Sequence, residues 1–421
     1  MSGGGPLAFG LMARGVNFMI DYNVIRQYNF PTTIRFGAGV IAELPEHLRS
    51  VGMQRPLLVT DPMVAQLDFF GDLRRKLEAR GLSVEVFSEI HKNPVKSDVE
   101  KGGAAFTGTG RDCIIGIGGG AAMDVARAVA LRVHHHRDLF DYDDLIGGDV
   151  YVTEEVPYFI TVPTTSGTGS EVGRSAIISE DDTHRKRILF SPKLLAKVVY
   201  ADPALTMGLP PFVTAATGMD ALTHNLEAYL AKNWHPMCEG IALEGVRLIH
   251  SSIADATLRP DLESRSKMMI GSLMGAVAFQ KGLGVVHSLA HPMSSLLDTH
   301  HGLANAVNLP YGMRFNIAGF EGKFRVIAQA MELPGGGGLR QDESVSEAER
   351  IAAGRADGEA VVERLFALNK ELGLPTKLRD VGVREEHLAP LADLAIADFA
   401  HPNNPKPVSR DDFFKLYKEA L

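Results

Sequence analysis

One carboxylate and several imidazoles form two short clusters in the second half of this 421-residue chain. Asp220 and His224 are four residues apart, His287 and His291 repeat that spacing, and His301 follows directly before a glycine. In a helix, residues four apart project from the same face, so both members of each pair can reach one ion. Three neutral imidazoles and one carboxylate suit Zn²⁺ or Fe²⁺ and leave room for a substrate oxygen. The pattern therefore predicts an enzyme with a divalent metal.

The chain has 15 histidines, so a single histidine is more often a surface or core residue than a ligand. Two helical pairs and a histidine before a glycine together favour the metal site. A metal of this kind would act as a Lewis acid on an alcohol or carbonyl oxygen.

The first half of the chain contains the elements that must carry a cofactor. Short apolar runs alternate there with helical patterns, which is typical of a parallel sheet. The run Cys113 to Ile117 leads directly into Gly118, Gly119 and Gly120 and then a helical pattern. Glycines at a helix N-terminus let backbone amides approach a pyrophosphate. The alternative is a tight strand-to-helix turn with no ligand.

A loop dense in hydroxyl groups and glycines, residues 162–171, follows the strand pattern at residues 158–162. Such a loop can surround a polar ligand with hydrogen-bonding groups. After residue 203 the pattern changes to long helices, including 214–230, 236–253, 262–279 and a helix that ends the chain. We predict a flexible extension over 1–21, an α/β domain with a parallel sheet over 22–203 and an all-helical domain over 204–421. Residues 335–358 are predicted to form a long surface loop.

Composition fits a two-domain enzyme, with 45% hydrophobic and 22% charged residues. The formal charge of −8 and the lack of a basic stripe argue against nucleic acid as a main partner. Cys113 and Cys238 are too few for a disulfide framework, which favours a reducing compartment. No apolar run is long enough to span a bilayer, and no secretory signal is evident. We predict a cytoplasmic enzyme that acts on a small molecule without membrane association.

Four motifs give the chain a resemblance to the iron-containing (group III) metal-dependent alcohol dehydrogenases. They are the three glycines with Asp124, the segment Pro163 to Glu171, the segment Gly218 to His224, and His287 and His291 followed by His301. The match runs from about Thr32 to the C-terminus. The resemblance implies metal binding by Asp220, His224, His287 and His301. His291 would lie beside the metal, either as a proton relay or as a group that orients the ligands. His300 matches no ligand position.

The resemblance also implies NAD(P) binding by the α/β domain, and the residues that it implicates are Asp61, Asn93, Gly118, Gly119, Gly120, Asp124, Thr164, Thr165, Thr168 and Lys186. An acidic group at position 61 would bond the ribose hydroxyls and repel a 2′-phosphate, so NAD is favoured over NADP. Ala121 replaces a serine that is usual in the family. The segment 292–295 replaces residues that are often glycines, which would alter the wall on the substrate side.

The reaction implied is hydride transfer between an alcohol and NAD. The segment 278–284 is similar to that of the 4-hydroxybutyrate dehydrogenases of the family and contains Lys281. A cation there would anchor the carboxylate of a short ω-hydroxy acid; the alternative is a lysine that faces solvent. We therefore predict an NAD-dependent alcohol dehydrogenase for primary alcohols, with Lys281 as a catalytic-site residue.

Two other functions are compatible with parts of this pattern. The wider superfamily contains polyol dehydrogenases and sugar-acid enzymes, including dehydroquinate synthase-like cyclases, with the same architecture. A non-catalytic nucleotide-binding protein would be credible had one of the four ligands been lost, but all four are present. The resemblance further implies a homodimer or a higher homo-oligomer, with the strand near residues 32–36 contributing to the contact.

Overall fold

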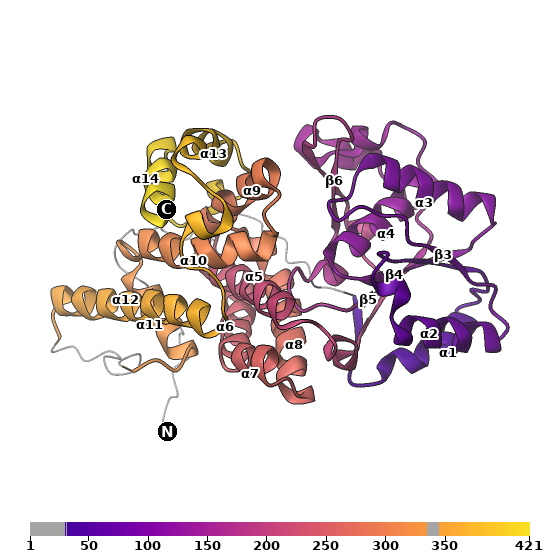
Figure 1. Cartoon of the computed structure of the whole chain (residues 1–421), viewed down its shortest axis with the longest axis horizontal. Coiled ribbons are helices and arrows are strands. Elements are labelled where there is room, and N and C mark those ends of the chain that lie inside the picture. Colours follow the sequence, from indigo (N-terminus) through magenta and orange to yellow (C-terminus); the bar gives the residue numbers. More distant parts are fainter. Residues whose placement is uncertain (1–29, 31, 335–344) are drawn as a thin grey trace, which may run out of the picture.

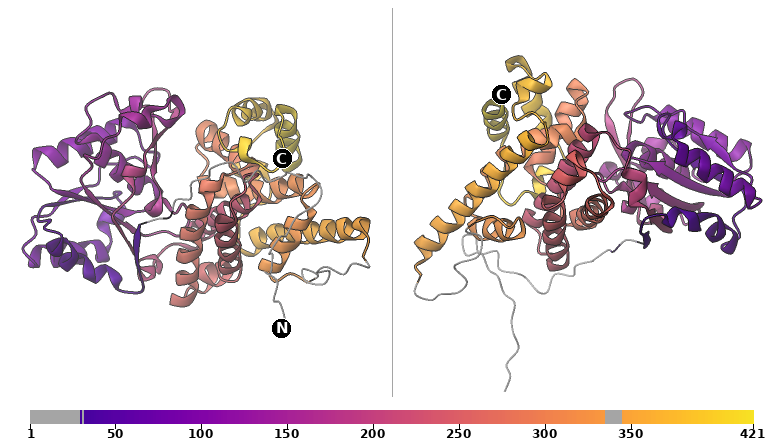
Figure 2. Two further views of the ribbon diagram at one scale, coloured as in Figure 1. Left: turned by 180° about the vertical axis from the view of Figure 1, so that it is seen from behind. Right: turned by 60° about the horizontal axis from the view of Figure 1, so that its bottom comes forward.

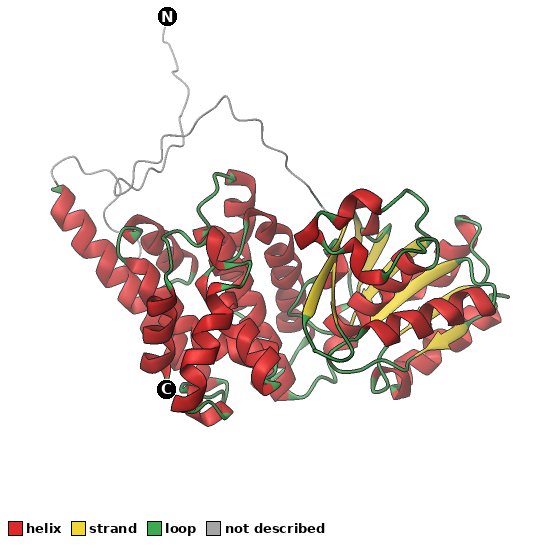
Figure 3. Cartoon of the chain, turned by 90° about the horizontal axis from the view of Figure 1, so that it is seen from above, coloured by secondary structure: helices red, strands yellow, loops and turns green. Residues whose placement is uncertain are grey.

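The structure is a computed structural model, and it describes residues 30, 32–334 and 345–421. An α/β half and a helical half lie side by side (Figure 1), and the strands gather in the first half (Figure 3). The predicted fold class, a parallel-sheet domain followed by a helical domain, is confirmed. The extension predicted at 1–21 lies outside the described residues.

The α/β half is built on a six-stranded sheet with the order β1-β8-β5-β4-β2-β3, in which every neighbouring pair is parallel. The two central strands β5 and β4 are buried almost throughout, as expected where helices cover both faces. The strands are β1 (Thr33–Phe36), β2 (Pro56–Val59), β3 (Glu85–Phe87), β4 (Cys113–Gly118), β5 (Tyr158–Pro163) and β8 (Val198–Ala201).

Two helices cover each face of this sheet. One face packs on α1 (Leu44–Ser50) and α2 (Asp68–Ala79), and the other packs on α3 (Lys96–Gly108) and α4 (Gly120–Arg132). An antiparallel hairpin of β6 (Ser175–Ser179) and β7 (Lys186–Phe190) packs on α4. Because all six strands are parallel, their carboxyl ends lie at one edge, where ligands of such sheets bind.

The helical half is organised around α5, which is buried along most of its length and contacts α6, α7, α8 and α10. Its helices are α5 (Pro211–Leu230), α6 (Pro236–His250), α7 (Ile253–Leu258), α8 (Leu262–Ala278), α9 (Val285–Leu297), α10 (His301–Ile317), α11 (Glu321–Ala330), α12 (Glu347–Glu371), α13 (Leu388–Ile396) and α14 (Arg410–Ala420). Figure 2 shows α12 extending along the outer side of this half. Among the described residues, no single helix is long and apolar enough to cross a membrane.

The surface loop predicted for residues 335–358 is wrong over its second part. Ser346 begins α12 with a capping box to Glu349, which satisfies backbone donors at the helix start. Gly354 and Gly358 lie inside this helix, where an added Cβ would come within 3.0 Å of Glu321 and Ile317. These glycines therefore allow α12 to pack closely on neighbouring segments. Residues 335–344 lie outside the described part of the chain.

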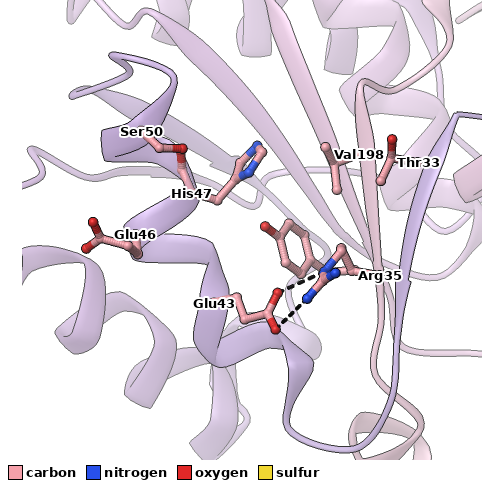
Figure 4. A pocket seen from close by; sticks show the side chains of 8 residues that line it. Thr33, Arg35, Glu43, Glu46, His47, Ser50 and Val198 are labelled. Atoms are coloured by element: carbon pink, nitrogen blue, oxygen red, sulfur yellow. Dashed lines mark hydrogen bonds and ion pairs between the residues drawn. The ribbon is translucent and has the colours of Figure 1, made fainter.

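The α/β half also contains a hollow of about 490 Å³ between β1, β8 and α1 (Figure 4). An ion pair between Arg35 and Glu43 crosses it, with 2.8 Å between the charged atoms. His47 lines the same hollow and lies 2.9 Å from the hydroxyl of Tyr158. None of the residues predicted for catalysis or cofactor binding lines this hollow.

Candidate active site

Three helices bring the four predicted metal ligands together. Asp220 and His224 lie one turn apart on α5, His287 lies on α9, and His301 is the first residue of α10. Gly302 makes this approach possible, because an added Cβ would come within 2.3 Å of the Ala216 carbonyl oxygen on α5. One ligand atom from each of the four residues lies within 4.8 Å of the others.

The carboxylate of Asp220 is the centre of this cluster. Its Oδ1 lies 3.9 Å from Nε2 of His224, 3.8 Å from Nε2 of His287 and 3.4 Å from Nε2 of His301. His224 and His287 stack with 4.7 Å between their ring centroids. Asp220, His224 and His287 are buried, whereas the His301 side chain is 32% exposed. The cluster is therefore open on the side of His301.

The protonation states of these groups suit a cation. Burial alone would raise the pKa of Asp220, but the three imidazoles outweigh burial and lower this pKa to about 2. Burial holds the pKa values of His287 and His301 well below their usual value, so both rings are neutral near pH 7. The ionised carboxylate of Asp220 therefore converges with the neutral imidazoles of His287 and His301, which fits Fe²⁺ or Zn²⁺.

Glu227, one turn beyond His224 on α5, fixes the orientation of His287. Its Oε2 lies 2.6 Å from Nδ1 of His287, and its Oε1 accepts the backbone N–H of Val286 at 2.6 Å. A carboxylate oxygen that accepts this bond requires the proton on Nδ1. Nε2 of His287 then presents its lone pair to the cluster, as in the carboxylate–histidine pairs of metal sites. Burial raises the pKa of Glu227 to about 7, and the backbone donors oppose that rise.

Asn305 lies one turn after His301 on α10 and reaches the same centre. Its Nδ2 donates to Oδ1 of Asp220 at 2.7 Å and lies 3.3 Å from Nε2 of His287 and 3.2 Å from Nε2 of His301. The amide therefore holds the Asp220 carboxylate in place from inside the protein.

His291 lies beside the cluster, outside the set of four. Its ring stacks on His301 with 5.4 Å between centroids, and Nδ1 lies 2.8 Å from Oδ2 of Asp398. Ser288 donates to the other oxygen of Asp398 at 2.6 Å. Burial opposes ionisation of Asp398, but His291 and the hydrogen bonds lower its pKa to about 2. The ring is thus held by a charged partner on one nitrogen.

His300, which matched no ligand position, caps the N-terminus of α10. Its Nδ1 accepts the backbone N–H of Leu303 at 3.4 Å.

The glycines predicted to bind NAD lie at the carboxyl edge of the sheet against the hydroxyl-rich loop. Gly118 ends β4, and Thr164 donates its backbone N–H to the Gly118 carbonyl at 2.9 Å. An added Cβ on Gly119 would lie 3.4 Å from Thr165, and one on Gly120 would lie 2.9 Å from Thr168. The structure therefore brings these six cofactor candidates together at the start of α4.

Asp61 follows β2 at the same edge. Its Oδ1 accepts the backbone N–H groups of Met63 and Val64 at 2.9 Å, and its Oδ2 faces Gly118. Asn93, another cofactor candidate, is exposed and donates to Asp298 at 2.6 Å. That bond joins the α/β half to the loop after α9.

Asp124 and Lys186 lie deeper at the junction of the two halves. Asp124 accepts hydrogen bonds from Ser170 at 2.8 Å and from the Ile177 backbone at 3.2 Å, so both its oxygens have protein partners. Burial lowers the pKa of Lys186, and the charges of Asp124, Asp398 and Asp298 oppose that effect. Acids from both halves of the chain therefore act on the charge of Lys186.

The prediction that Lys281 meets a substrate carboxylate is wrong for this structure. The side chain is fully buried, and Nζ donates to the Tyr229 carbonyl at 2.9 Å and to Glu239 at 2.8 Å. Lys323 shares both partners. The charge of Lys281 is therefore balanced inside the helical half, which a resemblance in local sequence could not reveal.

Comparison with known proteins matches both halves. The family described as iron-containing alcohol dehydrogenase matches residues 31–203, and the Fe-containing alcohol dehydrogenase family, C-terminal, matches residues 214–421. The chain belongs to the iron-containing alcohol dehydrogenase family. It is accordingly an oxidoreductase of the alcohol dehydrogenase type.

Several known proteins are similar to this chain over nearly its whole length. A 4-hydroxybutyrate dehydrogenase from Cupriavidus necator is 37% identical over 401 residues, with 93% of this chain and 98% of the relative covered. The crystal structure of a 1,3-propanediol oxidoreductase has a TM-score of 0.85 and 30% identity, covering 94% of this chain and 100% of the other. A sulfoacetaldehyde reductase from Bifidobacterium kashiwanohense, solved in complex with NAD⁺, has a TM-score of 0.82 and 26% identity, covering 94% and 99%.

Three residues of the site were missed from the sequence. Glu227 and Asn305 were within reach of the same argument, because each lies one turn beyond a predicted ligand on the same helix. Asp398 gives no such signal, because it is more than a hundred residues from His291 and sits in a loop after α13.

Proposed function

We propose that this enzyme is an NAD-dependent, metal-dependent alcohol dehydrogenase that interconverts a primary alcohol and its aldehyde. The observation that carries the proposal is the convergence of Asp220, His224, His287 and His301 within 4.8 Å. We assign these four residues as the ligands of one Fe²⁺ or Zn²⁺ ion. When bound, the ion supplies a Lewis acid that favours loss of the alcohol proton and polarises the carbonyl of the aldehyde.

The residues around the cluster hold and position groups for this reaction. Glu227 keeps the proton of His287 on Nδ1, and Asn305 orients Asp220. His291 stacks on the open side of the cluster at His301, with Nδ1 bonded to Asp398. Its Nε2 is then the atom that accepts a proton released by the alcohol and passes it on.

We place the pyrophosphate of the cofactor at Gly118, Gly119 and Gly120, beside Thr164, Thr165 and Thr168. The N-terminus of α4 starts there and offers backbone amides to an anion. Asp61 lies at the same edge, where its carboxylate disfavours the 2′-phosphate of NADP. We retain Asn93, Asp124 and Lys186 as residues that shape the cofactor site, although Asn93 and Asp124 are bonded to protein groups.

The substrate that we favour is a short ω-hydroxy acid such as 4-hydroxybutyrate. The similar 4-hydroxybutyrate dehydrogenase and sulfoacetaldehyde reductase are both named for anionic substrates, which supports this choice. A neutral diol or another polyol is the second candidate, because a 1,3-propanediol oxidoreductase is similar in structure.

The test is anaerobic NAD reduction by stripped enzyme reloaded with Fe²⁺ or Zn²⁺, with 4-hydroxybutyrate, other ω-hydroxy acids and neutral primary alcohols. We expect turnover that depends on the metal and on NAD and that favours the acids. Turnover that favours neutral alcohols would support the dehydrogenase function but refute the ω-hydroxy acid as the substrate. No turnover with either metal would refute the proposed function.

We also propose a homodimer that forms through β1. Among the residues that the structure describes, this strand ends the sheet with β8 as its one neighbour, and Phe36 on it is 42% exposed. An exposed edge of this kind is suited to pairing with a second chain. Light scattering after size-exclusion chromatography should give a dimer for the wild type and a monomer for Phe36→Asp; a monomeric wild type would contradict the proposal.

We place the enzyme in the cytoplasm. Both cysteines, Cys113 and Cys238, are free and buried, which fits a reducing compartment. Fractionation of the producing cells should recover the activity in the cytoplasmic fraction; recovery outside it would contradict this assignment.

A further inference from the structure

A cavity of about 350 Å³ lies between the β6–β7 hairpin and the end of α8. Arg174, Phe190, Phe279 and Gln280 are among the residues that line it. Arg174 comes from the segment just before β6, and Phe279 from the turn after α8. The volume is within the range of small-molecule sites, and the cavity lies at the junction of the two halves, where such sites occur.

Arg174 presents a charge to this cavity without an acidic partner among the described residues. Its guanidinium lies 5.4 Å from the centroid of the Phe190 ring, and no carboxylate within the described part of the chain acts on its charge. Burial lowers its pKa, and no nearby acid offsets that effect. A half-buried arginine of this kind gains a charge-assisted, two-point hydrogen bond when a carboxylate enters.

One aromatic ring lies between the cavity and the proposed metal centre. Phe279 lines the cavity, and its ring centroid lies 5.3 Å from that of His224. The hairpin gives a second connection. Ala176, Ile178 and Leu189 face the core on α4, so alternation turns the other face of the hairpin away from α4.

That second face of the hairpin has Lys186 at one end and Phe190 at the other. Lys186 stands at one end of it, where its charge acts on His301 and Asp398. Ser175 and Phe190 pair at the other end and line the cavity. The charges of Asp124, Asp398 and Asp298 already act on Lys186, so it is a poor anchor for another carboxylate. No acid among the described residues has such an effect on Arg174.

We propose that Arg174 anchors the carboxylate of an ω-hydroxy acid whose hydroxyl end lies at the histidine cluster. The inference rests on the proposed dehydrogenase function and names the residue that selects its substrate class. Phe279 then lies against the apolar middle of the substrate. Arg174 takes the role that the sequence had suggested for Lys281.

The test compares 4-hydroxybutyrate with its neutral amide, 4-hydroxybutyramide, as substrates of the metal-loaded enzyme. Arg174→Met should raise KM for the acid by about 10- to 100-fold, the effect of losing a hydrogen bond to a charged group. It should change KM for the amide by less than about twofold. Arg174→Lys should fall between wild type and Arg174→Met. Arg185→Met, an exposed arginine of the same hairpin, is the matched control and should change neither substrate.

Calorimetric titration of 4-hydroxybutyrate into the NAD complex separates this inference from the function itself. If the enzyme has no turnover but the acid binds more weakly to Arg174→Met than to wild type, the role of Arg174 is supported and the dehydrogenase function is refuted. Turnover with an acid-to-amide ratio that Arg174→Met leaves unchanged would overturn the anchor alone. Equal losses on both substrates, or no binding of the acid to a folded wild type, would also overturn it. Circular dichroism establishes that each variant is folded.

Discussion

Oδ2 of Asp398 lies 2.8 Å from Nδ1 of His291, and the same carboxylate accepts a hydrogen bond from Ser288. His291 therefore has one nitrogen fixed by a charged acceptor while its ring stacks on His301. This arrangement orients a ring beside the cluster without adding it to the ligand set. It makes the loop after α13, at the end of the chain, part of the active site.

Asp398→Asn should lower kcat by about 10- to 100-fold, the range seen when the partner of a site histidine is removed. The amide can place a donor against Nδ1, which loosens the ring or reverses its tautomer. Metal content should remain at the wild-type level, because His291 is outside the set of four. Asp393→Asn is the control, because Asp393 lies on α13 and forms an exposed ion pair with Arg410 of α14. Loss of metal together with activity would contradict the assignment.

Glu227→Gln should weaken metal affinity by about 10- to 100-fold. The substituted amide keeps an oxygen for the backbone N–H groups but turns an N–H toward the N–H of His287. Competition with a chelator measures the affinity directly, and Glu244→Gln on the exposed side of α6 is the matched control. Equal affinities in wild type and Glu227→Gln would show that this carboxylate does not orient the ligand.

Gly120→Ala should raise Kd for NAD roughly tenfold, since overpacking of this kind costs about 1–3 kcal/mol. The added Cβ would come within 2.9 Å of the Thr168 methyl group. Thr168→Ser removes that methyl group, so the double variant should recover most of the affinity. Fluorescence titration with NADH gives all three values. If the double variant binds no better than Gly120→Ala, contact between these two segments does not limit the site.

Lys281→Met should change how stability depends on pH. Burial, with a smaller effect of Lys323, lowers the pKa of Lys281 from 10.5 to about 7. Between these values the unfolded chain holds a proton that the folded chain has released, so this lysine adds stability as pH rises. The free energy of unfolding of wild type relative to Lys281→Met should therefore increase by roughly 1.4 kcal/mol per pH unit from pH 7 to 10.

Urea unfolding of both proteins at several pH values measures that difference, and Lys267→Met on α8 is an exposed control. A difference that stays constant with pH would contradict the buried, deprotonating lysine. Catalysis should retain its preference for acids in Lys281→Met, because Nζ of Lys281 is bonded to Glu239 and Tyr229 inside the helical half.

The sequence was most informative where chemistry and local structure share one period. The pairs at 220 and 224 and at 287 and 291 predicted helices. The structure places the first pair on α5 and the second pair on α9. The glycines after β4 predicted a strand-to-helix turn, which the structure has at Gly118 to Gly120. In both cases a short run of sequence is enough, because the helix or the turn itself brings the functional groups together.

The sequence was least informative where contacts join distant segments. Asp398 reaches His291 across 107 residues, and Arg174 faces the cavity beside Phe279 from the other half of the chain. The prediction that Lys281 meets the substrate is wrong because only its neighbours in sequence lie near the histidines. Its long side chain ends at Glu239 on α6. The loop predicted for residues 335–358 is wrong from Ser346 onward, because the polar stretch there begins a capped helix. Gly354 and Gly358 let this helix pack closely on Glu321 and Ile317.

The most direct test of the central claim is the metal content of purified protein, measured by elemental analysis beside NAD-dependent turnover, in wild type and in His287→Ala and His301→Ala. The account predicts about one Fe or Zn per wild-type chain, and loss of both metal and turnover in each variant, with a folded protein by circular dichroism. Turnover that persists at wild-type level in a variant without metal would contradict it.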